Sequence, residues 1–359
     1  MSVLSRLYRN ETTFDFVGRK RIGFTISAIL LTLSVGSLLV RGLNLGVDFE
    51  GGTVIEVTNE SNATVADVRD VLRPFGLEAA TVQLTSGGSE GIRVQAEIIE
   101  DPQVEESVVT AVAEVAGVAA NDASVTAVGP AFGEEITRSA VRALVIFLIV
   151  VALFIAWRFE WKMALAGLTA LFHDLLLTAG VYSITAFEVT PSTVVAILTI
   201  LGYSLYDTVV VFDKIVETVQ ISEGRRSLDQ IINDSMNTVL MRSLNTSLTS
   251  LLPVGSLLFI GSFLLGATTL REFALALFVG VAAGTYSSIF VASPLLATWK
   301  ASEPEWAELE EKAAPAVPAR PDTPPATKKK AKEQSPERPP APASGPKPRP
   351  PKKGKRKRR

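Results

Sequence analysis

Six stretches of mostly apolar residues recur along the chain, separated by polar segments. Each is close to the roughly 20 residues that an α-helix needs to cross the hydrocarbon core of a bilayer. They lie at residues 22–40, 139–157, 163–187, 192–215, 243–265 and 273–299. The pattern predicts a polytopic α-helical membrane protein with six transmembrane helices.

The first apolar stretch follows a basic start that includes Arg19, Lys20 and Arg21, so a cleaved signal peptide is an alternative interpretation. The apolar run is long for a signal peptide, and no cleavage site of the Ala-x-Ala kind follows it. We therefore expect a retained first crossing at 22–41, preceded by an N-terminal segment at 1–21.

The polar block at residues 42–138 has the alternation and turn signals of a small folded domain. Strands are expected at 51–58, 80–85, 91–98 and 123–129, and helices at 64–76 and 103–115. A Ser-Gly-Gly-Ser-Glu segment at 86–90 predicts a hairpin between the second and third strands. The order βαββαβ is that of the ferredoxin-like split βαβ arrangement. The block contains no nucleophile–base pair, so we expect binding or lever-like movement from it.

The five later crossings form a bundle at residues 139–299. Its one long polar connection, at 216–242, is expected to hold an amphipathic surface helix. The tail at 300–359 is rich in Pro, Ala and Lys and too poor in apolar residues to fold. We expect a disordered tail. Its polybasic end could be simply solvated, or it could be attracted to anionic lipid or to ribosomal RNA.

Charge is distributed unevenly, although the formal net charge is only −2. The block at 42–138 has 17 acidic and 4 basic residues, whereas residues 313–359 have 3 acidic and 15 basic ones. Lys and Arg in short loops mark the cytoplasmic side of a membrane. They occupy both chain ends and the connections at 158–162 and 214–242, with one further Arg at 266–272 as an exception. Both termini are therefore expected to be cytoplasmic and the acidic domain extracytoplasmic.

Composition also narrows the chemistry. The chain has no cysteine and a single histidine, which excludes disulfides and makes zinc and iron–sulfur sites improbable. The sequence has no glycine-rich nucleotide-binding loop, which argues against ATP as the direct energy source. We expect no metal, no cofactor and no soluble enzyme activity.

Charged residues inside the apolar stretches are the strongest functional candidates, because each costs at least about 2.5–3.5 kcal/mol to insert. Asp207 lies in the fourth stretch and shares a helical face with Thr199, Tyr203 and Tyr206. A carboxyl group on such a polar stripe can bind and release protons near neutral pH. The alternative is a permanent structural pair with a basic residue. Asp213 is expected to be an interfacial charge.

Arg242 opens the fifth stretch and shares a helical face with Thr246, Thr249 and Pro253. An arginine side chain stays protonated, so it does not carry the proton itself. It can instead act as a counter-ion that determines when a nearby carboxyl group ionises. Snorkelling of its side chain to the cytoplasmic surface is the alternative.

The third stretch contains the adjacent pair His173 and Asp174. A structural hydrogen-bonded pair and a proton relay are both open, and adjacent residues on a helix point about 100° apart. In the sixth stretch, Gly280 and Gly284 form a small-x-x-x-small face that allows close helix packing.

Five sequence motifs in the order of the chain resemble the SecF family, the small subunits of the SecD–SecF accessory complex of bacterial protein export. The resemblance runs from about residue 14 to residue 299. The motifs are GVDFEGGT at 46–53, HD at 173–174, GYSLYDTVVVFDKI at 202–215, MRSLNTSLTSLLPV at 241–254 and GTYSSIFVASP at 284–294.

The resemblance implies a function. SecF-like proteins belong to a proton-driven superfamily that includes multidrug exporters, and with SecD they use the proton gradient to help draw an exported chain across the membrane. Asp207 matches the membrane carboxylate assigned to proton passage, and Arg242 matches the arginine that works with it. Asp174 matches an acidic position whose role is less settled. Tyr206 is a departure, because SecF-like sequences usually have Asn there.

The resemblance also implies partners and a location. Six crossings are half of the two-fold arrangement that such pumps require, so a SecD-like subunit should supply the other half. The Sec translocon channel, the exported polypeptide and membrane lipids are further expected partners, in the bacterial plasma membrane. A small-molecule or lipid exporter is an alternative, although an outer domain of under 100 residues is small for a drug channel. A passive scaffold is another, and it would leave Asp207 and Arg242 unexplained.

Overall fold

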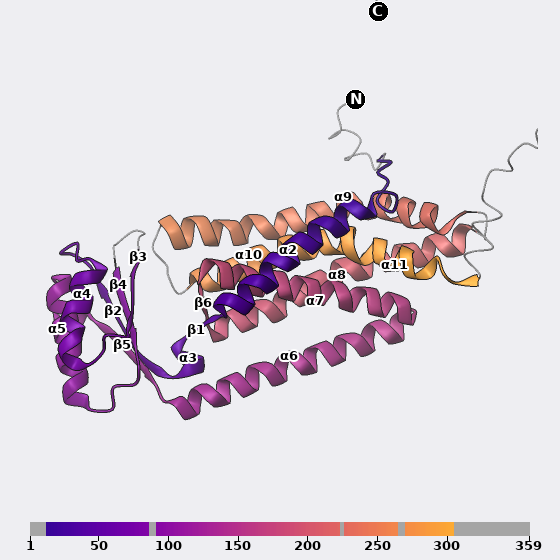
Figure 1. Cartoon of the computed structure of the whole chain (residues 1–359). Coiled ribbons are helices and arrows are strands. Elements are labelled where there is room, and N and C mark those ends of the chain that lie inside the picture. The colour runs from indigo at the N-terminus through magenta and orange to yellow at the C-terminus, as the bar shows by residue number, and fades with distance from the viewer. Residues whose placement is uncertain (1–11, 86–90, 223–225, 265–269, 305–359) are drawn as a thin grey trace, which may run out of the picture. The chain divides into compact units, whose positions relative to one another are not determined.

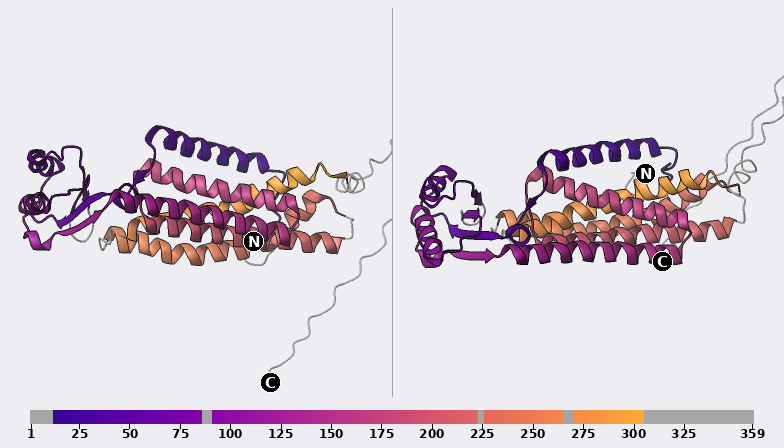
Figure 2. Two further views of the ribbon diagram at one scale, coloured as in Figure 1. Left: turned by 90° about the horizontal axis from the view of Figure 1, so that it is seen from below. Right: turned by 60° about the horizontal axis from the view of Figure 1, so that its bottom comes forward.

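The computed structural model describes residues 12–85, 91–222, 226–264 and 270–304. Within these ranges, six helices are long and apolar enough to span a membrane, which confirms the predicted number of crossings. Figures 1 and 2 show these helices lying side by side. The spans are Lys20–Arg41, Pro130–Arg158, Trp161–Thr185, Pro191–Ser222, Leu228–Ser262 and Arg271–Lys300. We call this set of helices the membrane bundle.

Four of the spans are single α-helices. These are α2 (Lys20–Arg41), α6 (Pro130–Arg158), α7 (Trp161–Thr185) and α8 (Pro191–Ser222). The other two change to π-helical turns near a proline. Helix α9 (Leu228–Ser256) continues as π-helical turns at Leu257–Leu264, and α10 (Arg271–Ser287) is joined to α11 (Ser293–Lys300) by π-helical turns at Ser288–Ala292. Pro253 and Pro294 each remove a backbone N–H from the helical ladder, which explains the local change.

The largest apolar core of the bundle lies between α7, α8, α9 and α11. Its fully buried side chains include Met163, Leu171, Phe212, Ile215 and Leu228. By contrast, α6 exposes a long row of apolar side chains. Such an apolar outer surface matches a helix that faces lipid on one side.

The expectation of a separate surface helix at 216–242 is wrong. The described part of this segment belongs to two long helices, because α8 continues to Ser222 and α9 begins at Leu228. A capping box starts α9: the Ser227 side chain accepts a hydrogen bond from the Gln230 backbone, and the Gln230 side chain accepts one from the Ser227 backbone. The apolar side of the first turns of α9, with Leu228, Ile231 and Ile232, is buried in the bundle.

Between α2 and α6 the chain forms a four-stranded antiparallel sheet. Its strands are β2 (Gly52–Thr58), β3 (Thr81–Thr85), β4 (Gly91–Ala96) and β5 (Ser124–Val128), in the order β3-β4-β2-β5. Helices α4 (Val65–Leu72) and α5 (Pro102–Ala116) pack on the sheet over one apolar core. We call residues 52–128 the sheet domain. Thr64 and Asp101 cap its two helices, as side chains of these types do at helix N-termini.

A second, very short sheet was not expected from the sequence. Strand β1 (Asn44–Leu45) pairs in parallel with β6 (Glu188–Val189), which lies between α7 and α8. The short helix α3 (Val47–Glu50) follows β1 and packs closely on α6, where a Cβ atom added to Gly133 would lie 2.6 Å from the Phe49 carbonyl oxygen. These contacts fix the ends of the spans on the side of the sheet domain.

Three sequence-based expectations lie outside the described residues. They concern the hairpin turn at 86–90, the first eleven residues, and the tail from residue 305 on.

Candidate functional site

Asp207 lies in the middle of α8, and a neighbouring helix provides its hydrogen bond. The hydroxyl of Ser243 on α9 donates to Asp207 Oδ2 over 2.6 Å. Ser243 is buried and Asp207 is half-buried. The carboxyl group therefore has a neutral hydroxyl donor inside the bundle.

Arg242 lies next to this hydrogen bond but has a different partner. Its Nη2 donates to the hydroxyl oxygen of Tyr206 over 2.9 Å, and both side chains are exposed on the surface of the bundle. Within the described ranges, no ion pair joins Arg242 to Asp207. The structure thus brings Asp207 and Arg242 to neighbouring positions, and the guanidinium group of Arg242 is hydrogen-bonded to Tyr206.

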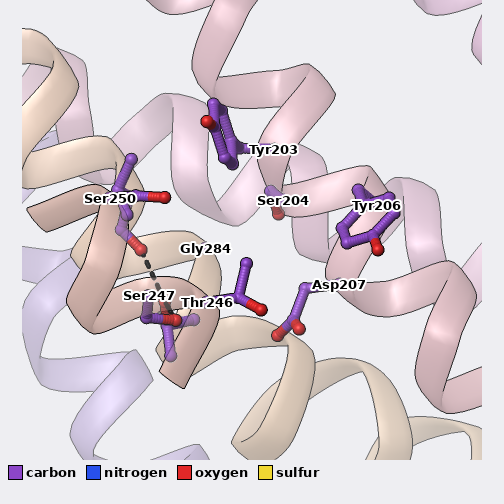
Figure 3. A pocket seen from close by; sticks show the side chains of 10 residues that line it. Tyr203, Ser204, Tyr206, Asp207, Thr246, Ser247, Ser250 and Gly284 are labelled. Atoms are coloured by element: carbon purple, nitrogen blue, oxygen red, sulfur yellow. Dashed lines mark hydrogen bonds between the residues drawn. The ribbon is translucent and has the colours of Figure 1, made fainter. Parts of the chain in front are cut away.

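A small pocket beside Asp207 opens between α8, α9 and α10 (Figure 3). Its volume is about 20 Å³, which exceeds the roughly 10–15 Å³ that one water molecule requires. Most of its lining residues are polar: Tyr203, Ser204, Tyr206, Asp207, Thr246, Ser247, Ser250, Val281, Gly284 and Thr285. Tyr203, Tyr206 and Thr246 were expected on the same faces as the charged residues, whereas Thr199, Thr249 and Pro253 do not line the pocket.

Asp174, on α7, is a further carboxyl group inside the bundle, and it is fully buried. Its Oδ2 accepts hydrogen bonds from Ser204 on α8, over 2.5 Å, and from Ser287 on α10, over 2.7 Å. Its Oδ1 lies 3.0 Å from His173 Nδ1, and the His173 ring stacks on Tyr286. The pair therefore forms one hydrogen-bonded unit that joins three helices.

Ser204 connects the surroundings of the two carboxyl groups. It donates to Asp174 and also lines the pocket beside Asp207. Sequence reasoning missed Ser204 and Ser243 and interpreted Ser287 only as a small residue of the packing face, since serines are common in transmembrane helices and carry little signal. The one available signal was the three-residue spacing of Ser204 and Asp207, which places both on one face of a helix.

The two glycines of the sixth stretch lie where α10 meets α8. A Cβ atom on Gly280 would lie 2.3 Å from the Ile200 side chain, and one on Gly284 would lie 2.9 Å from Ser204 Cβ. These distances are shorter than van der Waals contact, so both positions require glycine for the observed packing. Gly284 thereby allows α10 to pack against Ser204, which lies between Asp174 and the pocket beside Asp207.

Asp213 lies six residues beyond Asp207 on the same helix and is exposed. Its Oδ1 accepts a hydrogen bond from Arg158 Nη2, at the end of α6, over 2.5 Å. The pair lies outside the pocket. Asp213 therefore provides a natural comparison for Asp207.

Comparison with known proteins gives a family for the fold and the site. A family model described as protein export membrane protein SecD/SecF, C-terminal, matches residues 107–302, and one described as the SecD/SecF GG motif matches residues 36–58. Protein translocase subunit SecF of Streptomyces coelicolor is 40% identical over 310 residues, which cover 86% of this chain and 82% of that protein. The chain belongs to the SecF family. With its six candidate spans, this SecF-family chain is a multi-pass bacterial membrane protein.

Two further relatives extend the match. SecF of Pseudomonas aeruginosa is 36% identical over 285 residues, covering 79% of this chain and 90% of that protein. The crystal structure of SecDF from Thermus thermophilus superposes with a TM-score of 0.72 at 35% sequence identity. That match covers 81% of this chain and 39% of the SecDF chain. This SecF-family chain therefore corresponds to a part of the fused protein.

Proposed function

We propose that this chain is a proton-conducting half of a Sec protein-translocation unit, with Asp207 as the residue that takes up and releases the proton. Its SecF and SecDF relatives are translocase subunits, so the process is protein translocation, and the small-molecule or lipid exporter is not favoured. The use of protons to drive this process is a separate proposal, which is argued from the geometry of the site.

The observation that carries the proposal is the environment of Asp207. It lies inside a candidate span, accepts a hydrogen bond from the neutral Ser243 and borders a pocket that can hold water. A carboxylate permanently paired with a base would stay ionised, whereas a carboxyl group bonded only to a hydroxyl can exist in both protonation states. Water in the pocket would give the proton a way in and out.

Arg242 and Tyr206 are proposed to adjust this exchange. The guanidinium group is held by the Tyr206 hydroxyl beside the carboxyl group. When Asp207 loses its proton, the arginine can turn from the neutral tyrosine to the new negative charge, which attracts it more strongly. Asp174 and His173 are proposed to be secondary members of the proton pathway that keep α7, α8 and α10 in register.

A SecD-like subunit is the expected partner of the face around this site. Tyr206, Arg242, Asn245 and Thr249 are exposed there, although they lie in candidate membrane spans. Polar side chains of membrane helices usually face protein or water rather than lipid. The SecDF protein of Thermus thermophilus is 36% identical and more than twice as long as the matched part, which supports a second half built against this one.

We further propose that the sheet domain is an extracytoplasmic, ferredoxin-like split βαβ unit and that both termini are cytoplasmic. The strand order β3-β4-β2-β5 and the acidic composition of the block at 42–138 support this assignment. The translocon channel and the exported polypeptide are the proposed partners on that basis. Membrane lipids, and anionic lipid or the ribosome for the basic tail, remain proposals from the sequence.

The test is protein export into membrane vesicles, measured with and without a proton gradient for the Asp207→Asn variant. Asparagine keeps the shape and the hydrogen bond to Ser243 but carries no exchangeable acid proton. We expect export to fall to the level seen without a gradient. Asp213→Asn, on the same helix, is the matched control and should retain the stimulation. If Asp207→Asn kept full stimulation by the gradient, Asp207 would not be the proton carrier, and a passive scaffold would be favoured.

A further inference from the structure

Among the described residues, one ion pair links the sheet domain to the connection between α7 and α8. Arg93 lies on β4, and its Nη2 is 2.7 Å from Glu188 Oε2 on β6, the connection between α7 and α8. The other nitrogen, Nη1, is 3.4 Å from Glu56 Oε1 on the adjacent strand β2. A single guanidinium group therefore bridges a carboxylate of its own domain and a carboxylate of the bundle.

Glu188 is in an unusual position for an ionised side chain. Only 4% of it is exposed, and its Oε1 has no hydrogen-bond partner among the described residues. Three further acids repel its charge electrostatically: Glu56 on β2, Asp48 on α3 and Glu272 on α10. Arg271 is the second cation near this cluster, with its guanidinium carbon 5.5 Å from the ring centre of Phe187. Four acids therefore face two arginines, and a proton on Glu188 would reduce the negative excess while leaving Arg93 paired with Glu56.

The covalent connections between the sheet domain and the bundle are two short glycine segments. The chain enters the domain through Gly51 and Gly52, with Gly51 at φ 81°, and leaves it through Gly129. A Cβ atom on Gly129 would meet no described atom within 4 Å. Gly51 and Gly52 are closely packed, since added Cβ atoms would lie 2.9 Å from Pro130 Cα and 2.5 Å from the Ala96 carbonyl oxygen. The open Gly129 is therefore the freer of the two connections, and non-covalent contacts of the domain with the bundle limit rotation there.

We propose that the Arg93–Glu188 contact is a latch that sets the position of the sheet domain. The contact is an ion pair while Glu188 is ionised and a hydrogen bond from Arg93 to a neutral carboxyl group once Glu188 is protonated. The protonated form favours the latched arrangement, because it leaves no incompletely compensated charge buried. The latch rests on contacts within this chain, and its use in translocation rests on the proposed extracytoplasmic placement of the domain. There, the latch would respond to protons on the side from which they enter.

The sign of the proton effect follows from burial. In the latched arrangement, burial raises the pKa of Glu188 above its ordinary value. The positive charge of Arg93 lowers this pKa, but by less than burial raises it. In a released arrangement, Glu188 would meet water and its pKa would return toward the ordinary value. The latched arrangement therefore binds the proton more tightly, so acid favours it and loss of the proton favours release.

Distance measurements on the full chain in lipid nanodiscs test the latch. Since the chain has no cysteine, spin labels can be attached at Glu106→Cys on α5 and Thr185→Cys at the end of α7, two exposed positions. We expect the released fraction to rise at least about threefold between about pH 5 and about pH 8. Glu188→Gln, which is permanently neutral, should stay latched at both pH values. The exposed Glu97→Gln is the matched control and should behave like the wild-type sequence.

Arg93→Gln tests the other half of the latch. It leaves the Glu188 charge buried without its cation, so we expect a larger released fraction at about pH 8. Adding Glu188→Gln to the same chain should restore the latched distance, which also shows that the arginine variant is folded. If Glu188→Gln kept the wild-type pH response, or if Arg93→Gln left the distances unchanged, the latch would be contradicted. Neither result depends on export or on Asp207, so the proposed function is tested separately.

Discussion

At the scale of single residues, Tyr206 determines the partner of Arg242. Its hydroxyl accepts a hydrogen bond from the guanidinium group, next to Asp207 in the chain. The sequence already marked this position, because the resemblance to the SecF family leads one to expect Asn there.

The bond between Tyr206 and Arg242 predicts non-additive effects on stability. Tyr206→Phe and Arg242→Gln each remove the same hydrogen bond, so the double variant should lose about 0.5–1 kcal/mol less than the sum of the single variants. Thermal unfolding of the four proteins in detergent measures this coupling. Strict additivity would mean that the hydrogen bond contributes nothing to stability. It would contradict the proposal that Tyr206 holds Arg242 beside Asp207.

The sequence located the charged residues of the site but not their partners. Asp207, Arg242 and Asp174 stand out because charge is costly in an apolar stretch. Ser204, Ser243 and Ser287 carry no such cost, and their bonds to the carboxyl groups depend on how three helices are rotated. The bond of Arg242 to Tyr206 likewise depends on how α8 and α9 are placed, which the sequence alone does not predict.

At the scale of elements, the contact between α8 and α10 depends on glycine. Gly280→Val would place side-chain atoms on Ile200, so we expect a loss of about 1–3 kcal/mol in the free energy of unfolding. Thermal unfolding in detergent measures it. Gly202→Val on α8 is the matched control, because a Cβ there would meet no described atom within 4 Å. Equal losses in both variants would show that helix propensity, and not packing, causes the effect.

The elements also show what a pattern of apolar residues can predict. Long spans and alternating strands follow from periodicity. The strands were found within two residues of their expected bounds, whereas α6 begins at Pro130 and α9 at Leu228, well before the expected 139 and 243. The segment at 216–242 was misjudged because its polar residues hide the apolar side that α9 buries. The β1–β6 pair could not be found, since two-residue strands have no period and their partners lie 144 positions apart in the chain (Asn44 and Glu188).

At the scale of the whole molecule, the bundle is proposed to be one half of a larger assembly. The face that carries Arg242 and Tyr206 should be covered by a SecD-like subunit. Leu252 lies at the edge of this face on α9 and is 63% exposed, whereas Leu153 on α6 is 65% exposed. Tryptophan is tolerated by lipid but would clash in a packed interface.

We therefore expect Leu252→Trp to reduce co-purification of the SecD-like subunit at least about threefold, by a loss of about 0.7 kcal/mol or more. Leu153→Trp should leave it unchanged. The amount of partner recovered with the tagged chain is the measurement. The reverse order of the two effects would place the partner on α6.

Proton flux is the most direct test of the central claim, that Asp207 carries protons. Proteoliposomes that contain this chain and a SecD-like subunit, loaded with a pH-sensitive dye, report the initial rate of acidification under an imposed gradient. We expect Asp207→Asn to reduce this rate to that of empty liposomes, with Asp213→Asn close to the wild-type rate. A wild-type rate in the Asp207→Asn protein would contradict the account.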